Sequence, residues 1–173
     1  IHEGDALALL ARLPSECVSV LCADHPYSSG GMVRGDRMMG TTDKYLQADS
    51  GNRERTAEFS GDNRDQRAYG YWCALWLSEV LRATVPGGVG MLFCDWRQIG
   101  ATQDAFQAGG WVMRGVVPWT KPASRPQAGR FTQASEFVIW GSKGPMPIDY
   151  AAPVLPGWYH YSAPRDREHQ TQK

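Results

Sequence analysis

The sequence lacks an apolar run long enough to cross a bilayer, for which a helix needs roughly 20 residues. It also lacks the basic segment and apolar stretch of an N-terminal secretory signal. Cysteines are few, and the four present, Cys17, Cys22, Cys73 and Cys94, include no C-x-x-C pair. They lie among apolar neighbours, so we expect buried, reduced thiols rather than disulfides or a cysteine-type zinc site. These absences indicate a soluble intracellular protein.

Net charge is also absent, because 18 Lys and Arg residues balance 18 Asp and Glu residues. The two signs are unevenly distributed: residues 1–113 hold ten basic and fourteen acidic residues, whereas residues 114–173 hold eight and four. A basic C-terminal part is typical of a protein that binds a polyanion, although a solvated basic face explains it equally well.

The remaining composition is that of an ordinary globular domain, with 42% hydrophobic and 21% charged residues in a chain of 173. This length fits one domain, residues 1–173. The sequence starts without methionine and stops at Gln170-Thr171-Gln172-Lys173 with no predicted final element. We therefore expect a part of a longer protein.

Helical and strand patterns alternate along the chain, as in α/β proteins. Helix formers or an apolar stripe at three- and four-residue spacing predict helices over 5–13, 65–84 and 98–108. Apolar runs of strand length predict strands over 18–23, 89–94, 111–119 and 136–140. The first of these is expected to be a parallel strand buried on both faces. Residues 28–67 predict a long loop, and residues 141–173 predict a mostly irregular segment.

The tetrapeptide Asp24-His25-Pro26-Tyr27 directly follows the first predicted strand. Ligands of open parallel α/β sheets bind just outside the carboxyl ends of the strands. A carboxylate, backbone carbonyls in a proline-stiffened turn and an aromatic ring would suit a planar base that carries an amino group. A strand-end turn with an incidental aspartate and a packed tyrosine explains these four residues alone equally well.

The tetrapeptide resembles the D-P-P-Y signature of amino-group DNA methyltransferases that use S-adenosyl-L-methionine. Four further stretches extend this resemblance along nearly the whole chain: Gly4-Asp5, residues 86–88, residues 111–122 with a Trp-x-Lys-Pro tail, and His169 to Lys173, which is similar to the start of H-x-x-Q-K-P. Their order resembles the beta class, in which the tetrapeptide precedes a glycine loop. The resemblance implies an α/β, Rossmann-like S-adenosyl-L-methionine-dependent methyltransferase sheet with helices on both faces, incomplete at the C-terminus.

Two departures from the family pattern support an alternative function. The glycine loop, D-P-F-x-G-S-G-T, is absent, and His25 stands where the family usually has the first proline. Because proline fixes φ, we expect the histidine to loosen the turn. A general base is one role for its side chain, and an exposed loop residue is the simpler interpretation. The alternative is a catalytically impaired or truncated remnant that acts as a DNA-binding module. A third interpretation is an RNA or small-molecule methyltransferase on the same fold.

The resemblance implies methyl transfer to the exocyclic amino nitrogen of adenine in duplex DNA, with the base flipped out of the helix. Adenine is favoured over cytosine because the tetrapeptide begins with aspartate. The resemblance implies no metal, and it makes the tetrapeptide catalytic, with His25 acting through its carbonyl. It places five residues at the cofactor: Asp5, Asp24, His169, Gln172 and Lys173. The Asp5 position is explained equally well by a helix N-cap.

We expect DNA contacts in two regions. The loop 28–67 carries arginines that would face phosphates, and in the interval 119–167, which resembles the family's target-recognition region, basic residues are interleaved with aromatics. The residues expected to contact DNA are Arg34, Arg37, Lys121, Arg125, Arg130, Arg165 and Arg167. A solvated surface side chain is the simpler interpretation of any one of them. The resemblance implies double-stranded DNA as partner. The lack of a long apolar run predicts no membrane partner, and we expect a cytoplasmic protein of bacterial or phage origin. It leaves open a homodimer and a restriction endonuclease partner.

Overall fold

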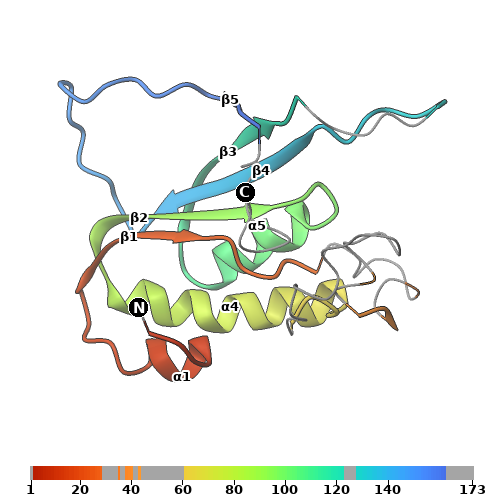
Figure 1. Ribbon diagram of the computed structural model, residues 1–173. Coiled ribbons are helices and arrows are strands. Elements are labelled where there is room, and N and C mark those ends of the chain that lie inside the picture. The colour runs from red at the N-terminus through yellow and green to blue at the C-terminus, as the bar shows by residue number, and fades with distance from the viewer. Residues whose placement is uncertain are drawn as a thin grey trace.

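The computed structural model describes residues 2–28, 35, 38–40, 43, 61–122 and 128–162. Its strands form one sheet in the order β1-β2-β4-β3-β5 (Figure 1). The strands are β1 (Val18–Ala23), β2 (Thr84–Cys94), β3 (Val112–Thr120), β4 (Ser135–Ser142) and β5 (Tyr159–His160). The helices are α1 (Ala6–Leu10), α4 (Gln66–Ala83) and α5 (Ile99–Ala108). The predicted alternation of helices and strands is confirmed.

Strands β1 and β2 are parallel neighbours, with Leu21 beside Gly90 and Ala23 beside Leu92. Their carboxyl ends therefore lie at the same edge of the sheet, so the residues that follow β1 meet those that follow β2. Strand β4 runs antiparallel to both β2 and β3, and the short β5 is parallel to β3. The sheet is mixed, which places the start of β4 and the end of β3 at this same edge.

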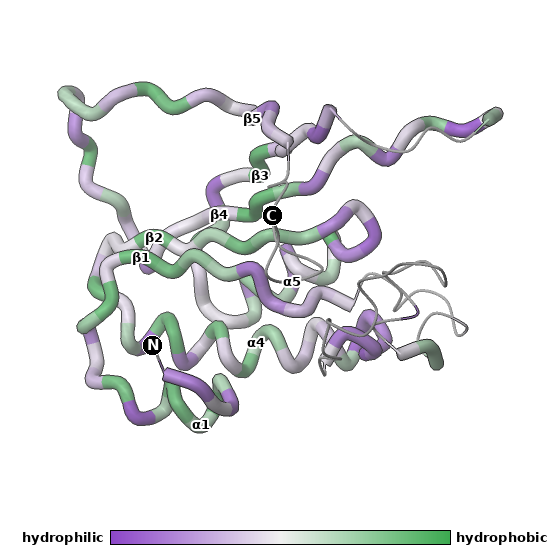
Figure 2. The backbone as a smooth tube through the Cα atoms, viewed as in Figure 1, coloured by the Kyte–Doolittle hydropathy of each residue, from purple (hydrophilic) through white to green (hydrophobic). Residues whose placement is uncertain are grey.

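Helix α4 supplies more of the buried core than any other described element. It begins at the N-cap Asp65, whose side chain accepts a hydrogen bond from the Ala68 amide. Its predicted apolar stripe is buried, and hydrophobic and hydrophilic residues alternate along the helix in Figure 2. The buried side chains that this stripe meets belong to α5, β2 and β4: Ala105, Phe106, Leu92, Cys94 and Ile139.

The helices α1, α4 and α5 lie on one face of the sheet (Figure 1). This differs from the expected helices on both faces, since no helix in the described part of the chain covers the second face. Burial of β1 on both faces was a wrong prediction: the side chain of Val20 is 53% exposed and Cys22 is exposed. The reason is that Leu21 and Ala23 pack against the core, whereas Val20 and Cys22 lie on the opposite face, which no described helix covers.

The expectation of four buried thiols is half correct. Cys73 and Cys94 are buried, whereas Cys17 and Cys22 are exposed, and all four are free. Cys17 lies in the turn before β1, where its thiol donates to the Pro14 carbonyl at 3.1 Å. None of the described helices is long and apolar enough to cross a bilayer.

Helix α1 is attached at the margin of the core and through its backbone. It contains no buried residue. The guanidinium of Arg82, near the end of α4, donates to the carbonyl oxygens of Leu10 at 3.0 Å and Leu13 at 2.9 Å. The link from α1 to the rest of the domain therefore combines these hydrogen bonds with the partly buried side chains of Leu7 and Leu10, which pack against the core.

Candidate functional site at the carboxyl ends of β1 and β2

The tetrapeptide 24–27 leaves the sheet at the carboxyl end of β1, beside the turn 95–98 that follows β2. Asp24 is exposed, whereas His25 and Tyr27 are partly buried. The next residue, Ser28, is fully buried and has a φ of 51°, a conformation that costs free energy for a residue with a side chain. The site thus combines an exposed carboxylate at Asp24 with a backbone that becomes fully buried at Ser28.

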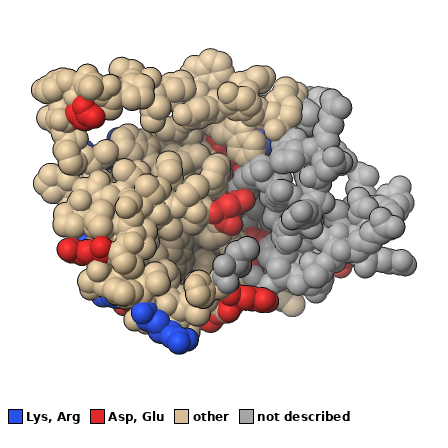
Figure 3. Space-filling view, turned by 60° about the vertical axis from the view of Figure 1, so that its left-hand side comes forward, with Lys and Arg blue, Asp and Glu red and all other residues tan. Residues whose placement is uncertain are grey.

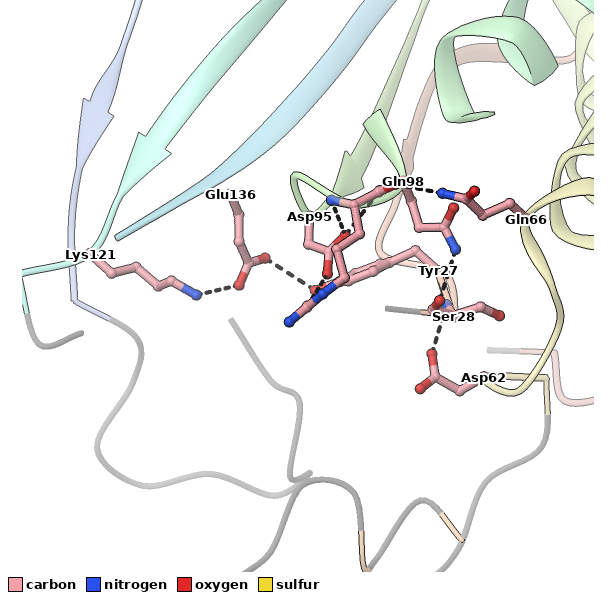
Figure 4. A network of polar contacts seen from close by, with 9 residues as sticks. Tyr27, Ser28, Asp62, Gln66, Asp95, Gln98, Lys121 and Glu136 are labelled. Atoms are coloured by element: carbon pink, nitrogen blue, oxygen red, sulfur yellow. Dashed lines mark hydrogen bonds and ion pairs between the residues drawn. The ribbon is translucent and has the colours of Figure 1, made fainter. Parts of the chain in front are cut away.

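Tyr27 is held by a pair of charged residues from the start of β4 and the end of β3 (Figure 4). Its hydroxyl donates to Oε2 of Glu136 at 3.2 Å, and Oε1 of Glu136 pairs with the ammonium of Lys121. Burial raises the pKa of Tyr27 well above its ordinary value, and the negative charges of Glu136, Asp24 and Asp95 raise it further. Tyr27 is therefore a neutral hydrogen-bond donor at physiological pH.

A second carboxylate, Asp95, lies in the turn after β2 and is largely buried. Its Oδ1 accepts from the backbone amides of Arg97 at 2.9 Å and Gln98 at 3.1 Å, and its Oδ2 pairs with the Arg97 guanidinium at 2.9 Å. Burial raises the pKa of Asp95, and the contacts with Arg97 oppose that shift. Asp95 and Asp24 place two carboxylates at this edge of the sheet, and Arg97 balances the charge of Asp95.

Ser28 is fixed by contacts from two segments, the residues before α4 and the turn after β2. Its amide donates to Oδ1 of the buried Asp62 at 2.9 Å, and its hydroxyl donates to the Gly61 carbonyl at 3.1 Å. Its own carbonyl accepts from Nε2 of Gln98 at 2.8 Å. Figure 4 shows Asp62 and Gln98 reaching this residue from different elements. These contacts satisfy the buried backbone groups of a strained residue.

His25 is not the exposed loop residue that we expected from the sequence. Its Nε2 lies 2.8 Å from the hydroxyl of Tyr69, and the two rings stack with centroids 5.8 Å apart and 11° between planes. Trp76 meets the same imidazole edge-on at 5.3 Å, and Trp72 lies at 6.2 Å. The prediction failed because α4 presents three aromatic side chains to the segment that follows β1.

The remaining predicted site residues are placed less centrally or fall outside the described residues. Asp5 caps α1, with Oδ1 accepting from the Ala8 amide at 3.0 Å, so the helix-cap interpretation holds and a cofactor role stays a prediction. Lys121 pairs with Glu136 and lies 5.6 Å from the Trp119 ring, and Arg130 is exposed. Outside the described residues lie Arg34, Arg37, Arg125, Arg165, Arg167, His169, Gln172 and Lys173.

Sequence reasoning missed several residues that hold the tetrapeptide: Tyr69, Asp62, Gln98 and Glu136. Tyr69 stands on the apolar stripe of α4, so its ring predicts core and nothing in the pattern reveals what its hydroxyl meets. Glu136 gave a usable signal, because it is a lone charged residue at the start of an otherwise apolar strand. A charge in such a place needs a partner, and Lys121 stands at the end of the preceding strand.

The described surface carries charge in small groups. In Figure 3 the face turned to the viewer is mainly uncharged, with acidic side chains at separate places and basic ones gathered near its lower edge. On this face the described residues form no continuous basic surface. Among the described residues no group of three or more His, Cys, Asp or Glu side chains could hold a metal ion.

The fold and the site together define an α/β domain with its polar site at the carboxyl ends of adjacent parallel strands. Residues 18–173 match the family model of N6 and N4 DNA methylases, and the chain belongs to this DNA methylase family. The methyltransferase M.HinfI of Haemophilus influenzae is 28% identical to it over 157 residues, which cover 83% of this chain and 38% of M.HinfI.

Two solved structures share the fold. The PvuII DNA methyltransferase, named as cytosine-N4-specific, has a TM-score of 0.62 at 16% identity and covers 96% of this chain and 58% of its own. A protein of Thermus thermophilus, described as a DNA modification methylase in complex with S-adenosyl-L-methionine, has a TM-score of 0.52 at 18% identity, covering 88% and 57%. The incomplete Rossmann-like α/β fold is confirmed. The chain spans between about two fifths and three fifths of these relatives.

Proposed function

We propose that this chain carries the catalytic tetrapeptide and DNA-contacting segments of an S-adenosyl-L-methionine-dependent DNA methyltransferase that modifies the exocyclic amino nitrogen of adenine. The observation that carries the proposal is the tetrapeptide itself. It lies at the carboxyl end of β1 with the Asp24 side chain exposed, while Tyr27 is fixed from behind by Glu136. Membership of the DNA methylase family supports the reaction class.

The chemistry follows from what the tetrapeptide offers an amino group. The Asp24 carboxylate and the His25 carbonyl each accept one hydrogen bond, which together orient the amino nitrogen and raise its electron density. The Tyr27 ring forms a wall for a base that has been flipped out of the duplex. Asp24 also accepts the proton that the nitrogen loses when it gains a methyl group. Most of the acceleration comes from orientation, and no covalent bond between enzyme and base is needed.

The Asp24 carboxylate at this edge of the sheet fits the cofactor. When bound, S-adenosyl-L-methionine supplies an electrophilic methyl group on a positively charged sulfur. Asp24 is exposed at the end of β1, whereas the charge of Asp95 is balanced by Arg97 at 2.9 Å. The negative charge of Asp24 favours a cationic molecule. We propose that Asp24 and Asp5, together with His169, Gln172 and Lys173, hold the cofactor.

The choice of base is tested by product analysis. The full-length protein is incubated with labelled S-adenosyl-L-methionine and duplex DNA, and the hydrolysed nucleosides are identified by mass. We expect N6-methyladenine, and we expect Asp24→Ala to abolish it while Asp104→Ala, which removes an exposed carboxylate from α5, leaves the yield unchanged.

Other products would change the conclusion in defined ways. N4-methylcytosine, the modification implied by the name of the PvuII relative, would keep the reaction class and overturn the preference for adenine. DNA binding without methylation of either base would overturn the catalytic function and favour the DNA-binding module. Preferential methylation of RNA would favour the third interpretation.

A further inference from the structure

A continuous chain of hydrogen bonds runs from the tetrapeptide to the start of α5. Nε2 of His25 lies 2.8 Å from the hydroxyl of Tyr69, and that hydroxyl lies 2.8 Å from Oγ1 of Thr102. Oγ1 of Thr102 in turn lies 2.8 Å from the carbonyl oxygen of Gln98. Tyr69, Thr102 and Gln98 are each 0% exposed, so water does not compete for these contacts.

Each donor in this chain can be assigned. The Gln98 carbonyl can only accept, so the hydroxyl hydrogen of Thr102 points to it. Thr102 therefore accepts from Tyr69, so the hydroxyl hydrogen of Tyr69 points to Thr102 and cannot be donated to His25. The oxygen of Tyr69 must accept from His25, which requires a hydrogen on Nε2 of the imidazole. Both the neutral Nε2–H tautomer and the imidazolium meet this requirement.

Gln98, the last residue of this series of hydrogen bonds, also holds the other side of the tetrapeptide. Its carbonyl accepts from Thr102, and its side chain donates to the Ser28 carbonyl at 2.8 Å. The Gln98 amide is itself bound to Oδ1 of Asp95 at 3.1 Å. Residues 25 and 28 are thus tied to one buried residue, and Tyr27 lies between the two ties.

We propose that the His25 side chain is a positioning residue, which fixes the backbone of the tetrapeptide on α4 and α5 so that the Asp24 carboxylate and the His25 carbonyl face the amino group. This inference rests on the proposed function. A proline at this position would restrict only its own φ and the residue before it. His25 restricts the segment through a directed hydrogen bond and a stacked ring instead.

The first test is independent of catalysis. In the protein labelled with ¹⁵N-histidine, we expect a slowly exchanging Nε2–H proton from His25, assigned by its loss in His25→Phe. Tyr69→Phe keeps the ring and removes the acceptor, so the proton should exchange at least about tenfold faster. Thr84→Val is the matched control, since it removes a buried hydroxyl at the far end of α4 that bonds to the Val80 carbonyl at 2.7 Å. It should leave the signal unchanged.

The second test separates positioning from stability. In the full-length protein we expect Tyr69→Phe to lower kcat by about fivefold, the loss of one hydrogen bond, with KM for DNA and for S-adenosyl-L-methionine within about twofold. In the His25→Phe background the same change should have an effect below about twofold, because the contact is already lost. A merely structural Tyr69 would lower kcat equally in both backgrounds.

The outcomes distinguish this inference from the proposed function. A protected proton with equal effects of Tyr69→Phe in the two backgrounds would overturn positioning and keep the hydrogen-bond chain. A His25 Nε2–H proton that exchanges rapidly with solvent would overturn the series of hydrogen bonds itself. If the wild-type protein transfers no methyl group, the proposed function fails and the positioning role fails with it, whereas the chain is still judged from the proton signal alone.

Discussion

Tyr27 and Glu136 are joined by a 3.2 Å hydrogen bond although they stand 109 positions apart in the sequence. The contact ties the segment after β1 to the start of β4, and Lys121 completes it from the end of β3. One aromatic residue of the tetrapeptide therefore depends on two strands that contribute no residue to it.

Removing the Glu136 carboxylate should loosen Tyr27. We expect Glu136→Ala to lower the free energy of unfolding by about 2 kcal/mol, because a half-buried Lys121 loses its partner. It should also lower kcat for methyl transfer by about fivefold. Glu136→Gln, which keeps an acceptor for the Tyr27 hydroxyl, should retain more activity than Glu136→Ala. Urea unfolding and initial rates measure the two effects.

Glu79→Ala is the control for this prediction, because Glu79 pairs with Arg82 at 3.0 Å on the surface of α4. A pair of this kind contributes little, so its loss should change the free energy of unfolding by less than about 1 kcal/mol. Equal losses from Glu136→Ala and Glu79→Ala would contradict a special role for Glu136.

The domain should lose stability in alkali because of buried acids. Burial raises the pKa of Cys73 to about 12, and it raises the pKa values of Tyr27 and Tyr69 above their ordinary range. The unfolded chain loses these protons first, near pH 8.5 for a thiol and near pH 10 for a phenol, so it binds fewer protons than the folded chain. Stability is then complete below about pH 8 and falls as pH rises above that.

Urea titrations at a series of pH values between about 7 and 11 would measure this fall in the free energy of unfolding. Tyr69→Phe removes one buried phenol, so its curve should be shallower above pH 10 than that of the wild type. Tyr150→Phe is the control, since Tyr150 is 95% exposed. A curve for Tyr69→Phe that parallels the wild type would contradict the assignment.

Two glycines should respond oppositely to alanine. A Cβ at Gly141 in β4 would lie 2.6 Å from Cε1 of Phe106 and would also meet the Val112 carbonyl oxygen. Gly141→Ala should therefore destabilise the domain by about 2 kcal/mol through overpacking. A Cβ at Gly100 in α5 meets nothing within 4 Å, so Gly100→Ala should stabilise by about 0.5–1 kcal/mol. Thermal unfolding of the pair tests both signs, and a stabilising Gly141→Ala would contradict the packing.

Two basic residues expected to contact DNA should differ in their effect on the salt dependence of DNA affinity. Arg130 is exposed, whereas the ammonium of Lys121 is engaged by Glu136. We expect Arg130→Ala to reduce the slope of log affinity against log salt by about 1. Lys121→Ala should leave that slope unchanged and lower turnover instead. Fluorescence anisotropy at several salt concentrations measures the slopes, and a reduced slope for Lys121→Ala would show that Lys121 binds phosphate.

Local sequence patterns predicted the bounds of helices and strands better than they predicted which elements pack or pair with one another. Strand β1 has the predicted bounds, and α4 differs by one residue at each end, because apolar spacing is a local property. Strand β2 starts at Thr84 rather than at 89, because the proline and glycines at 86–88 do not give a strand pattern in the sequence. In the structure these residues belong to β2, and the pairing of β1 with β2 is irregular beside them, between Val18 and Val20.

The sequence predicted the chemistry of the site but not the residues that hold the tetrapeptide in place. The tetrapeptide directly follows the first predicted strand, so its position at the end of that strand could be derived. The partners Tyr69 and Glu136 stand 44 and 109 positions from the residues they hold, and such distances leave no local signal. The exposure of His25 was predicted wrongly for the same reason, since the aromatic residues around it come from α4 and meet it only in the folded structure.

The attachment of α1 through Arg82 has a consequence for how the domain opens. A helix of five residues with no fully buried side chain loses only the partial burial of Leu7 and Leu10 and a few hydrogen bonds on detaching, so its amides should exchange with deuterium before those of β2 and α4. Arg82→Lys, which cannot reach both carbonyls in the same fork, should speed this exchange further. Because the tetrapeptide is tied to α4 and α5 instead, the start of the domain can fray while the edge that carries Asp24 keeps its order.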